Sequence, residues 1–297
     1  MTRACWLAFA AIAVAQQVPD TGFEPSPGAP TYSNGNGPLV ALDEGHRNFH
    51  TIDGRYAAFA KVLRADGFAV EPSRGSFALP RLAKVRVLAI ANALHPDNDG
   101  NWRLPTPSAF TAEEIRAVAA FVENGGGLLL IADHMPFAGA AEQLGRAVGV
   151  EFTNGYTQNA RGRSGVFVFR PGGGELELLP HPVLRGGIDA VATFTGSAFR
   201  LLDGGQPLLR LGKGFQSALA ERGGQVTPAT PRTNVDGWLQ GATLTRGKGR
   251  IAVFAEAAMF SAQWAGEERR PMGMNAPEAK WNQRFLANVV EWLAADR

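Results

Sequence analysis

The sequence predicts an α/β protein with a doubly wound, mostly parallel sheet of the flavodoxin-like type and an antiparallel β extension. The first reason is the segment GGGLLLIADHMP at Gly125–Pro136, where glycines lead into a continuous apolar run. A short apolar run bounded by turn residues is typical of a strand that is buried on both faces. The second reason is the order of predicted elements over residues 39–149. It alternates as β-α-β-β-α-β-α, which is typical of parallel sheets with right-handed crossovers.

The composition is that of a globular protein with many turns. The chain has 297 residues, of which 45% are hydrophobic and 19% charged, with 36 glycines and 19 prolines. This length suits one large domain or two small ones. We expect one α/β domain over residues 39–297 with a β-rich insertion at about 150–250. The net charge is only +2 and no Lys/Arg cluster is interleaved with aromatic residues, so nucleic acid is not a predicted partner.

The first 15 residues have the pattern of a secretory signal peptide. Arg3 supplies a positive charge, Ala4–Val14 is an apolar run too short to span a bilayer, and Ala13–Ala15 matches an A-x-A cleavage site. We therefore predict cleavage after about Ala15 and a periplasmic or secreted protein that does not span a membrane. A buried N-terminal helix is the alternative. Cys5 is the only cysteine, so the mature chain would have no disulfide and no cysteine nucleophile.

Residues 16–38, which are rich in proline, glycine and small polar residues, are predicted to form a linker. The parallel unit then begins with a strand at Leu39–Leu42. A helix is predicted from about Gly54 to Asp66, because its apolar residues recur at helical spacing and a glycine follows it. Short strands are predicted at Phe68–Glu71 and Val85–Ala91.

The next helix begins after Thr111, which forms a predicted capping box with Glu114. Its apolar stripe is followed by the central strand at Leu128–Ala132. Another helix is predicted after Pro136, and it ends at Gly149.

The second half of the chain predicts mainly short strands. Between residues 150 and 250 they are expected at 166–169, 176–179, 191–201, 207–211 and 215–220, followed by a loop at 227–234. Strands at Trp238–Thr245 and Arg250–Ala255 are predicted to form a hairpin that returns to the core. A long loop at 261–281 and a helix at Asn282–Ala295 complete the predicted fold.

Polar side chains gather directly after the predicted core strands. Carboxyl ends of parallel strands share one edge of a sheet, and ligands bind there in open α/β folds. Four of the five histidines lie in these loops, whereas His181, between two prolines, is expected to be structural. The candidate residues at this edge are Asp43, Glu44, His46, Asn48, His50, Asn92, His95, Asp97, Asp99, Asp133, His134 and Glu256.

This pattern suggests a metal site. His46 and His50 are four residues apart, so on a helical turn they would share one face and, with His134, could hold a divalent ion, zinc above all. Three such ligands plus water are the pattern of hydrolytic zinc sites. The acid or base would be Asp133, Glu44 or Glu256. The alternatives are loop hydrogen bonding for the two histidines, a capping turn for Asp133 and a structural carboxylate for Glu256.

Other catalytic motifs are missing from the sequence. There is no GxSxG nucleophile elbow, and the glycine runs at 125–127 and 172–174 lack the pattern of a phosphate-binding loop.

The order of elements, with GGGLLLIADH preceding a helix, resembles the class I glutamine amidotransferase-like fold. Within that fold the chain is most similar to secreted bacterial proteins near the trehalose-utilisation-like proteins. The resemblance covers about residues 38–150 and 250–295. In the amidotransferases the matching strand ends in an elbow that carries cysteine, whereas here that position falls at about Asp133. The resemblance therefore implies where the site lies, without thiol-based glutamine hydrolysis.

Together these features predict a metal-dependent hydrolase that acts on a small polar or carbohydrate substrate. Asn92, His95 and Trp102 would bind the substrate, and Trp102 could stack on a sugar ring. The alternative is a non-catalytic module of the cell envelope that binds a ligand or partner and has kept the fold. A third hypothesis is an envelope scaffold with residues 150–250 as its interface.

Overall fold

The computed structural model describes residues 17–26, 28–33, 35–159 and 161–295. Its centre is a ten-stranded mixed sheet, of which five adjacent strands are parallel. In spatial order these strands are β3 (Ala69–Ser73), β2 (Leu39–Asp43), β4 (Val87–Ala91), β5 (Gly127–Ile131) and β16 (Gly249–Phe254). Because they run in the same direction, the loops after β2, β4, β5 and β16 open at one edge.

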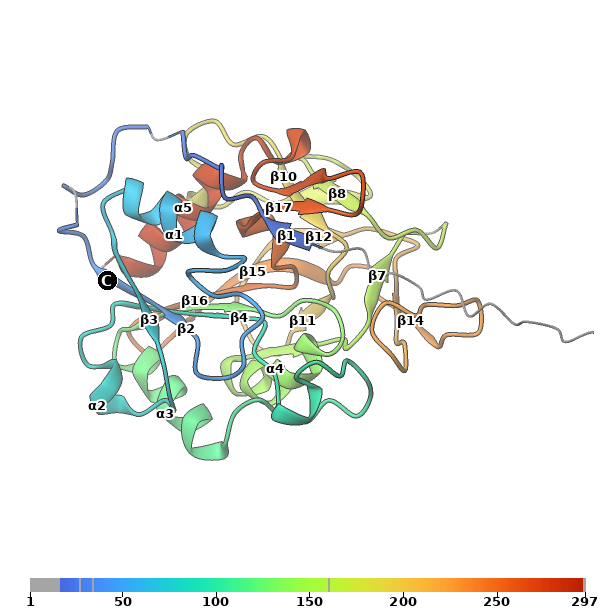
Figure 1. Cartoon of the computed structure of the whole chain (residues 1–297), viewed down its shortest axis with the longest axis horizontal. Helices are drawn as coiled ribbons and strands as arrows, with labels where there is room; N and C mark the ends of the chain where they lie inside the picture. Colours follow the sequence, from blue (N-terminus) through green and yellow to red (C-terminus); the bar gives the residue numbers. More distant parts are fainter. Residues whose placement is uncertain (1–16, 27, 34, 160, 296–297) are drawn as a thin grey trace, which may run out of the picture.

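Helices cover both faces of the sheet (Figure 1). One face carries α1 (Ala57–Ala65) and α5 (Asn282–Ala294). The other face carries α2 (Leu79–Leu82), α3 (Ala112–Glu123) and α4 (Phe137–Val148). Successive side chains of a strand point to opposite faces, so Leu129 joins the first core and Leu128 and Leu130 the second. This double burial explains the uninterrupted apolar run that the central strand shows in the sequence.

The predicted helix signals are present in the structure. Thr111 and Glu114 form the capping box at the start of α3, with the Glu114 backbone N–H donating to Thr111 Oγ1 over 3.3 Å. The end of α4 is Gly149, whose φ of 104° is left-handed and therefore favours glycine.

An antiparallel extension continues the main sheet beyond β16, as predicted. The strand β15 (Leu239–Arg246) forms a hairpin with β16. Further strands of the same sheet are β6 (Val150–Phe152), β9 (Leu176–Leu178), β11 (Phe199–Leu201) and β12 (Gln206–Leu211). A separate two-stranded sheet consists of β8 (Val166–Phe169) and β10 (Val191–Phe194). In another small sheet, β13 (Gln216–Ala218) lies between β7 (Tyr156–Gln158) and β14 (Arg232–Asn234).

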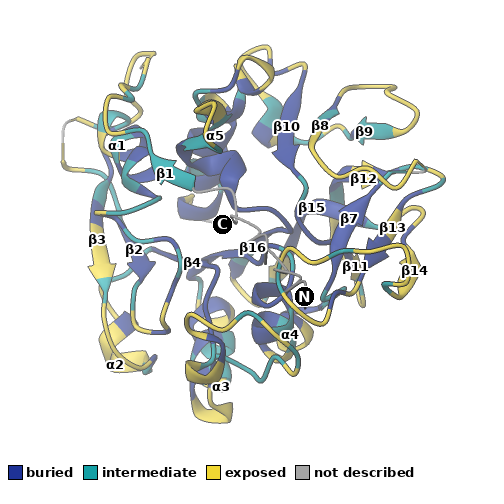
Figure 2. Cartoon of the chain, turned by 45° about the vertical axis from the view of Figure 1, so that its right-hand side comes forward, coloured by how far each residue is buried: buried dark blue, intermediate teal, exposed yellow. Residues whose placement is uncertain are grey.

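Two local predictions in this half were wrong. The predicted strand at 191–201 is two strands, β10 and β11, in different sheets. The chain turns between them at Thr195 and Gly196, whose φ angles are 77° and 69°. The predicted loop at 227–234 ends in the strand β14, which is exposed at the rim of the molecule (Figure 2).

The predicted loop at 261–281 was also wrong, because it contains the hairpin of β17 (Ala262–Ala265) and β18 (Arg270–Gly273). The strand β1 (Gln17–Pro19) pairs with β17, so part of the predicted linker belongs to this small sheet. Pairing between segments so far apart leaves no local sequence signal.

The predicted signal peptide lies outside the described residues. Among the described helices, none combines the length and apolarity needed to cross a membrane.

Candidate functional site

A cavity of about 500 Å³ lies at the carboxyl edge of the parallel strands. We call it the central cavity. Of the predicted site residues, six line it: His50, Asn92, Trp102, Asp133, His134 and Glu256. These residues come from the loops after all four core strands that were expected to share this edge. The structure therefore brings residues from these four loops together, as the strand order predicted.

Asp133 and His134 follow directly after β5 in the wall of the cavity. The His134 Nδ1 atom lies 2.9 Å from the Met135 carbonyl oxygen. A carbonyl only accepts hydrogen bonds, so the Nδ1 atom carries the proton and the Nε2 atom keeps a lone pair when the ring is neutral. That Nε2 atom lies 3.8 Å from Asp133 Oδ1, and the ring stacks on Tyr156 at a centroid distance of 4.2 Å. Asp133 makes no side-chain cap to α4, contrary to the capping alternative.

Asn92 holds the loop after β4 against the loop after β5. Its side-chain Oδ1 atom accepts the Asp133 backbone N–H over 2.9 Å. Its φ of 48° lies in the left-handed region, which asparagine tolerates better than most residues and which often marks functional sites. The amide Nδ2 atom is buried and has no hydrogen-bond partner.

Glu256 follows β16 and is fully buried. Its two carboxyl oxygens accept the backbone N–H groups of Ala258 and Met259 over 2.6 and 2.8 Å. Burial and the nearby charge of Asp133 raise the pKa of Glu256 well above its usual value. Burial, followed by the charges of Glu256 and Asp133, raises the pKa of the neighbouring Tyr56. Glu256 therefore holds its proton more tightly than an exposed carboxyl group does.

His50 and Arg55 also line the cavity. Burial, with the charge of Arg55 adding to it, lowers the pKa of His50 to about 3, so this imidazole is neutral at pH 7. His50 Nδ1, Arg55 Nε and Gln263 Oε1 are buried without a hydrogen-bond partner, as is the Asn92 amide nitrogen. Four unmatched polar atoms of one cavity are unusual, because most buried polar groups in proteins are paired.

Aromatic rings complete the cavity and border a wider groove outside it. The ring of Trp102 meets those of Phe49 and Phe137 edge to face, with centroids 5.1 and 5.0 Å apart. The outer groove has a volume of about 1100 Å³ and shares Trp102, Phe49 and His134 with the central cavity. An apolar wall with a few polar groups is typical of small-molecule sites.

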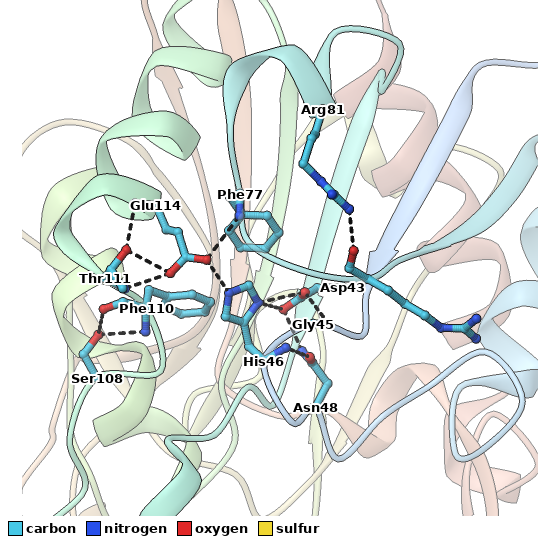
Figure 3. Close-up of polar contacts among 11 residues, drawn as sticks. Asp43, Gly45, His46, Asn48, Phe77, Arg81, Ser108, Phe110, Thr111 and Glu114 are labelled. Atoms are coloured by element: carbon cyan, nitrogen blue, oxygen red, sulfur yellow. Dashed lines mark hydrogen bonds and ion pairs between the residues drawn. The ribbon is translucent and has the colours of Figure 1, made fainter.

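His46 lies outside the cavity in a separate buried cluster (Figure 3). We call Asp43, His46, Asn48 and Glu114 the His46 cluster. The Nδ1 atom of His46 lies 2.9 Å from Asp43 Oδ1, and the Nε2 atom lies 2.9 Å from Glu114 Oε1. Asn48 Nδ2 donates to the other oxygen of Asp43 over 2.9 Å. Since both neighbours of the ring are carboxylates, both ring nitrogens donate and the imidazole is a cation.

The electrostatics of His46 agree with this assignment. Burial by itself lowers the pKa of His46, but the hydrogen bonds and charges of Asp43 and Glu114 outweigh it and raise the pKa above 6.5. The rings of Phe77 and Phe110 pack against the imidazole at centroid distances of 4.5 and 4.8 Å. The cluster ties the loop after β2 to the start of α3.

Of the residues that were given a catalytic, substrate-binding or metal-binding role, three do not line the cavity: His46, Glu44 and His95. Glu44 Oε1 accepts the Ile52 N–H over 2.8 Å, and its other oxygen pairs with Arg74. His95 caps a short 3₁₀ helix at Pro96–Asn98. His181 is structural as predicted, because it caps Pro182–Leu184 and bonds Thr243.

The structure does not bring His46, His50 and His134 together as metal ligands. Both ring nitrogens of His46 are engaged by carboxylates. Within the described part of the chain, no group of three or more His, Cys, Asp or Glu residues is arranged to hold a metal ion. The i, i+4 argument assumed a helical turn, whereas α1 begins only at Ala57.

Sequence reasoning missed Gln17, Arg55 and Gln263, which also line the cavity. Arg55 stands in the loop that had been singled out, but a lone arginine before a helix carries no specific signal. Gln17 and Gln263 reach the site through the pairing of β1 with β17, which only the tertiary structure shows.

No protein-family model and no curated protein matches the sequence. Solved structures do resemble it. The N-terminal domain of mmIFT52 has a TM-score of 0.60 at 14% identity, covering 86% of this chain and 97% of that one. Cytoplasmic protein STM1381 from Salmonella typhimurium LT2 has a TM-score of 0.53 at 14% identity, covering 86% and 98%. A ThuA-like protein from Bacteroides uniformis has 0.49 at 13%, covering 91% and 94%.

These similarities concern the fold. At such identities a shared fold implies no shared activity, since the same fold carries many functions. The function has to be argued from the central cavity itself.

Proposed function

We propose that the protein hydrolyses a small polar substrate of the carbohydrate class in the central cavity, with His134 as the general base. One observation carries this proposal: His50, Arg55, Asn92 and Gln263, each with a buried polar atom that has no partner, line the same cavity as Asp133 and His134. A buried polar atom left unpaired costs about 1–3 kcal/mol, so this wall keeps polar side chains at a cost to stability. A ligand with several hydroxyl or carbonyl groups would match the polar side chains that line the cavity.

The proposed reaction uses protonation states that the geometry favours. The His134 Nε2 lone pair accepts a proton from water, and the water oxygen then attacks the electrophilic carbon of the substrate. Glu256, whose pKa is raised by burial and by Asp133, donates its proton to the leaving oxygen or nitrogen. Asp133, 3.8 Å from His134 Nε2, stabilises the imidazolium that forms. A buried carboxylic acid with a raised pKa is a typical general acid of hydrolytic sites.

The carbohydrate class is favoured by the walls of the cavity. Sugar rings have polar edges and apolar faces, and the cavity combines amide groups with the rings of Trp102, Phe49 and Phe137. A non-catalytic module that binds the same class of ligand is the second candidate. It is favoured by Glu256, because both of its oxygens already accept backbone N–H groups.

A panel of p-nitrophenyl glycosides, esters and amides tests the proposal. With any substrate that the mature protein turns over, we expect Asp133→Asn and His134→Gln each to lower kcat/KM by about 100-fold or more. Glu44→Gln is the matched control, because it changes a carboxylate outside the cavity, and it should stay within about twofold of the wild type. Saturable binding without turnover of any panel member would instead support the binding module.

A divalent metal in the cavity stays a prediction. His50 and His134 face the cavity, so a metal bound there would depend on them and not on His46. Elemental analysis of protein purified without a histidine tag tests this. Near-stoichiometric zinc that is lost in His50→Ala but retained in Glu44→Gln would support a metal site.

A further inference from the structure

Arg55 brings a cation into the central cavity. Its guanidinium lies over the ring of Phe49, 3.9 Å from the ring centroid, and its Nη2 atom donates to the Gln17 carbonyl over 2.9 Å. These two contacts hold the planar group in place. The Nε–H donor is buried without a partner. Within the described part of the chain, Arg55 makes no ion pair with a carboxylate, and no other Lys or Arg lines this cavity.

The central cavity contains charges of both signs. The positive charge of Arg55 acts on His50, whose pKa it helps to lower. The negative charge of Asp133 acts on Tyr56, Tyr156 and Glu256, whose pKa values it helps to raise. Arg55 and Asp133 both line the cavity. A complementary ligand offers an anionic group to Arg55 and a neutral reacting group to the residues around Asp133.

We propose that Arg55 binds a carboxylate of the ligand, so that the protein selects acidic sugars or similar hydroxy acids over their neutral counterparts. This inference rests on the proposed function, because it assumes that the central cavity is the substrate site. Arg55 and Asn92 line the same cavity, so a guanidinium and a side-chain amide are both part of its wall. A single guanidinium with neutral donors matches the single charge of a carboxylate.

The inference also explains why this partly buried cation has no carboxylate counter-ion among the described residues. Burial lowers the pKa of Arg55, yet arginine stays protonated in proteins. A charge that is desolvated without a counter-ion destabilises the fold. If the ligand supplies a carboxylate, it pairs with the Arg55 guanidinium and offsets this cost when it binds.

Matched pairs of probes test this proposal with the mature protein at pH 7. D-glucuronate is compared with D-glucose, and acetate with acetamide, by thermal shift and isothermal titration. We expect the carboxylate of each pair to bind at least tenfold more tightly. Arg55→Gln should remove that preference, whereas Arg55→Lys should keep part of it because the charge remains. Arg222→Gln, which removes a cation from the outer groove, should leave the preference unchanged.

Three results would overturn the proposal. The first is equal binding of the charged and neutral probes, including no binding of either. The second is a preference that survives Arg55→Gln. The third is a preference for sulfate over acetate, which would indicate a tetrahedral anion. If Arg55→Gln fails to fold, the test uses Arg55→Lys, and full wild-type affinity in that variant would count against the proposal.

Two further results separate this inference from the proposed function. Hydrolysis of neutral substrates that is insensitive to Arg55→Gln would contradict this inference and leave the proposed function standing. Carboxylate binding without any turnover would support this inference and contradict the proposed hydrolysis.

Discussion

The His46 cluster and the central cavity lie at the same edge of the sheet and contain the same types of residue, but their hydrogen bonding differs. In the cluster both ring nitrogens of His46 contact carboxylates, and none of its side-chain polar atoms is buried without a partner. In the cavity the His50 and Asn92 side chains each leave a buried polar atom unmatched. Paired polar groups stabilise the packing of loops, whereas buried groups without partners reduce stability.

The comparison shows that a histidine at the end of a strand is not by itself a sign of a site. His46 and His50 are only four positions apart and both are buried, yet the pKa of the first is raised and that of the second lowered. The difference comes from their neighbours. His46 has two carboxylates within 3 Å, and His50 has the cation Arg55 nearby.

The largest expected effect that separates the two regions is on stability. His46→Gln leaves Asp43 and Glu114 buried without their cation, and we expect a loss of about 3–5 kcal/mol in the free energy of unfolding. Gln263→Met in the cavity removes an unmatched oxygen together with the hydrogen bond from Nε2 to Ser261 Oγ, and it should lower the free energy of unfolding by at most about 1.5 kcal/mol. Urea denaturation at pH 6 measures both. Equal losses in the two variants would mean that the cavity groups are also structural.

The pH dependence of the cavity is the next expected effect. Above pH 6.5, His50 is neutral in the folded and the unfolded chain. As the pH falls below 6.5, the unfolded chain binds a proton that the folded chain does not bind until about pH 3. The free energy of unfolding therefore decreases with falling pH. His50→Phe lacks this titration, so thermal unfolding should show it gaining stability relative to wild type between pH 7 and 5. A constant difference would contradict the assigned neutral state.

The His46 cluster should show a smaller effect of opposite sign. Below pH 6.5 the imidazole is protonated in both the folded and the unfolded chain, so its full stabilisation is present. This stabilisation is lost as the pH rises from 6.5 through the raised pKa of the folded state. The difference in unfolding temperature between wild type and His46→Gln should thus shrink from pH 6 to pH 9. If it grew instead, His46 would be neutral in the fold.

Much of the fold could be predicted from the sequence because it depends on local signals. The apolar run at Leu128–Ala132, the Thr111–Glu114 capping box and the glycine that ends α4 each predicted the element found there. The hairpin within residues 261–281 could not be predicted, because its strands are short and one of them pairs with β1 at the other end of the chain.

The sequence by itself determined which loops would meet, since strand polarity and apolar patterning bring the loops after β2, β4, β5 and β16 to one edge. Only the tertiary structure decided which polar groups at that edge are paired. The reason is the range of the interactions. One partner of His46 is Glu114, 68 residues away, and Arg55 donates to the carbonyl of Gln17, 38 residues away. Hydrogen-bond partners at such separations follow from the packing of whole elements, and no local pattern encodes them.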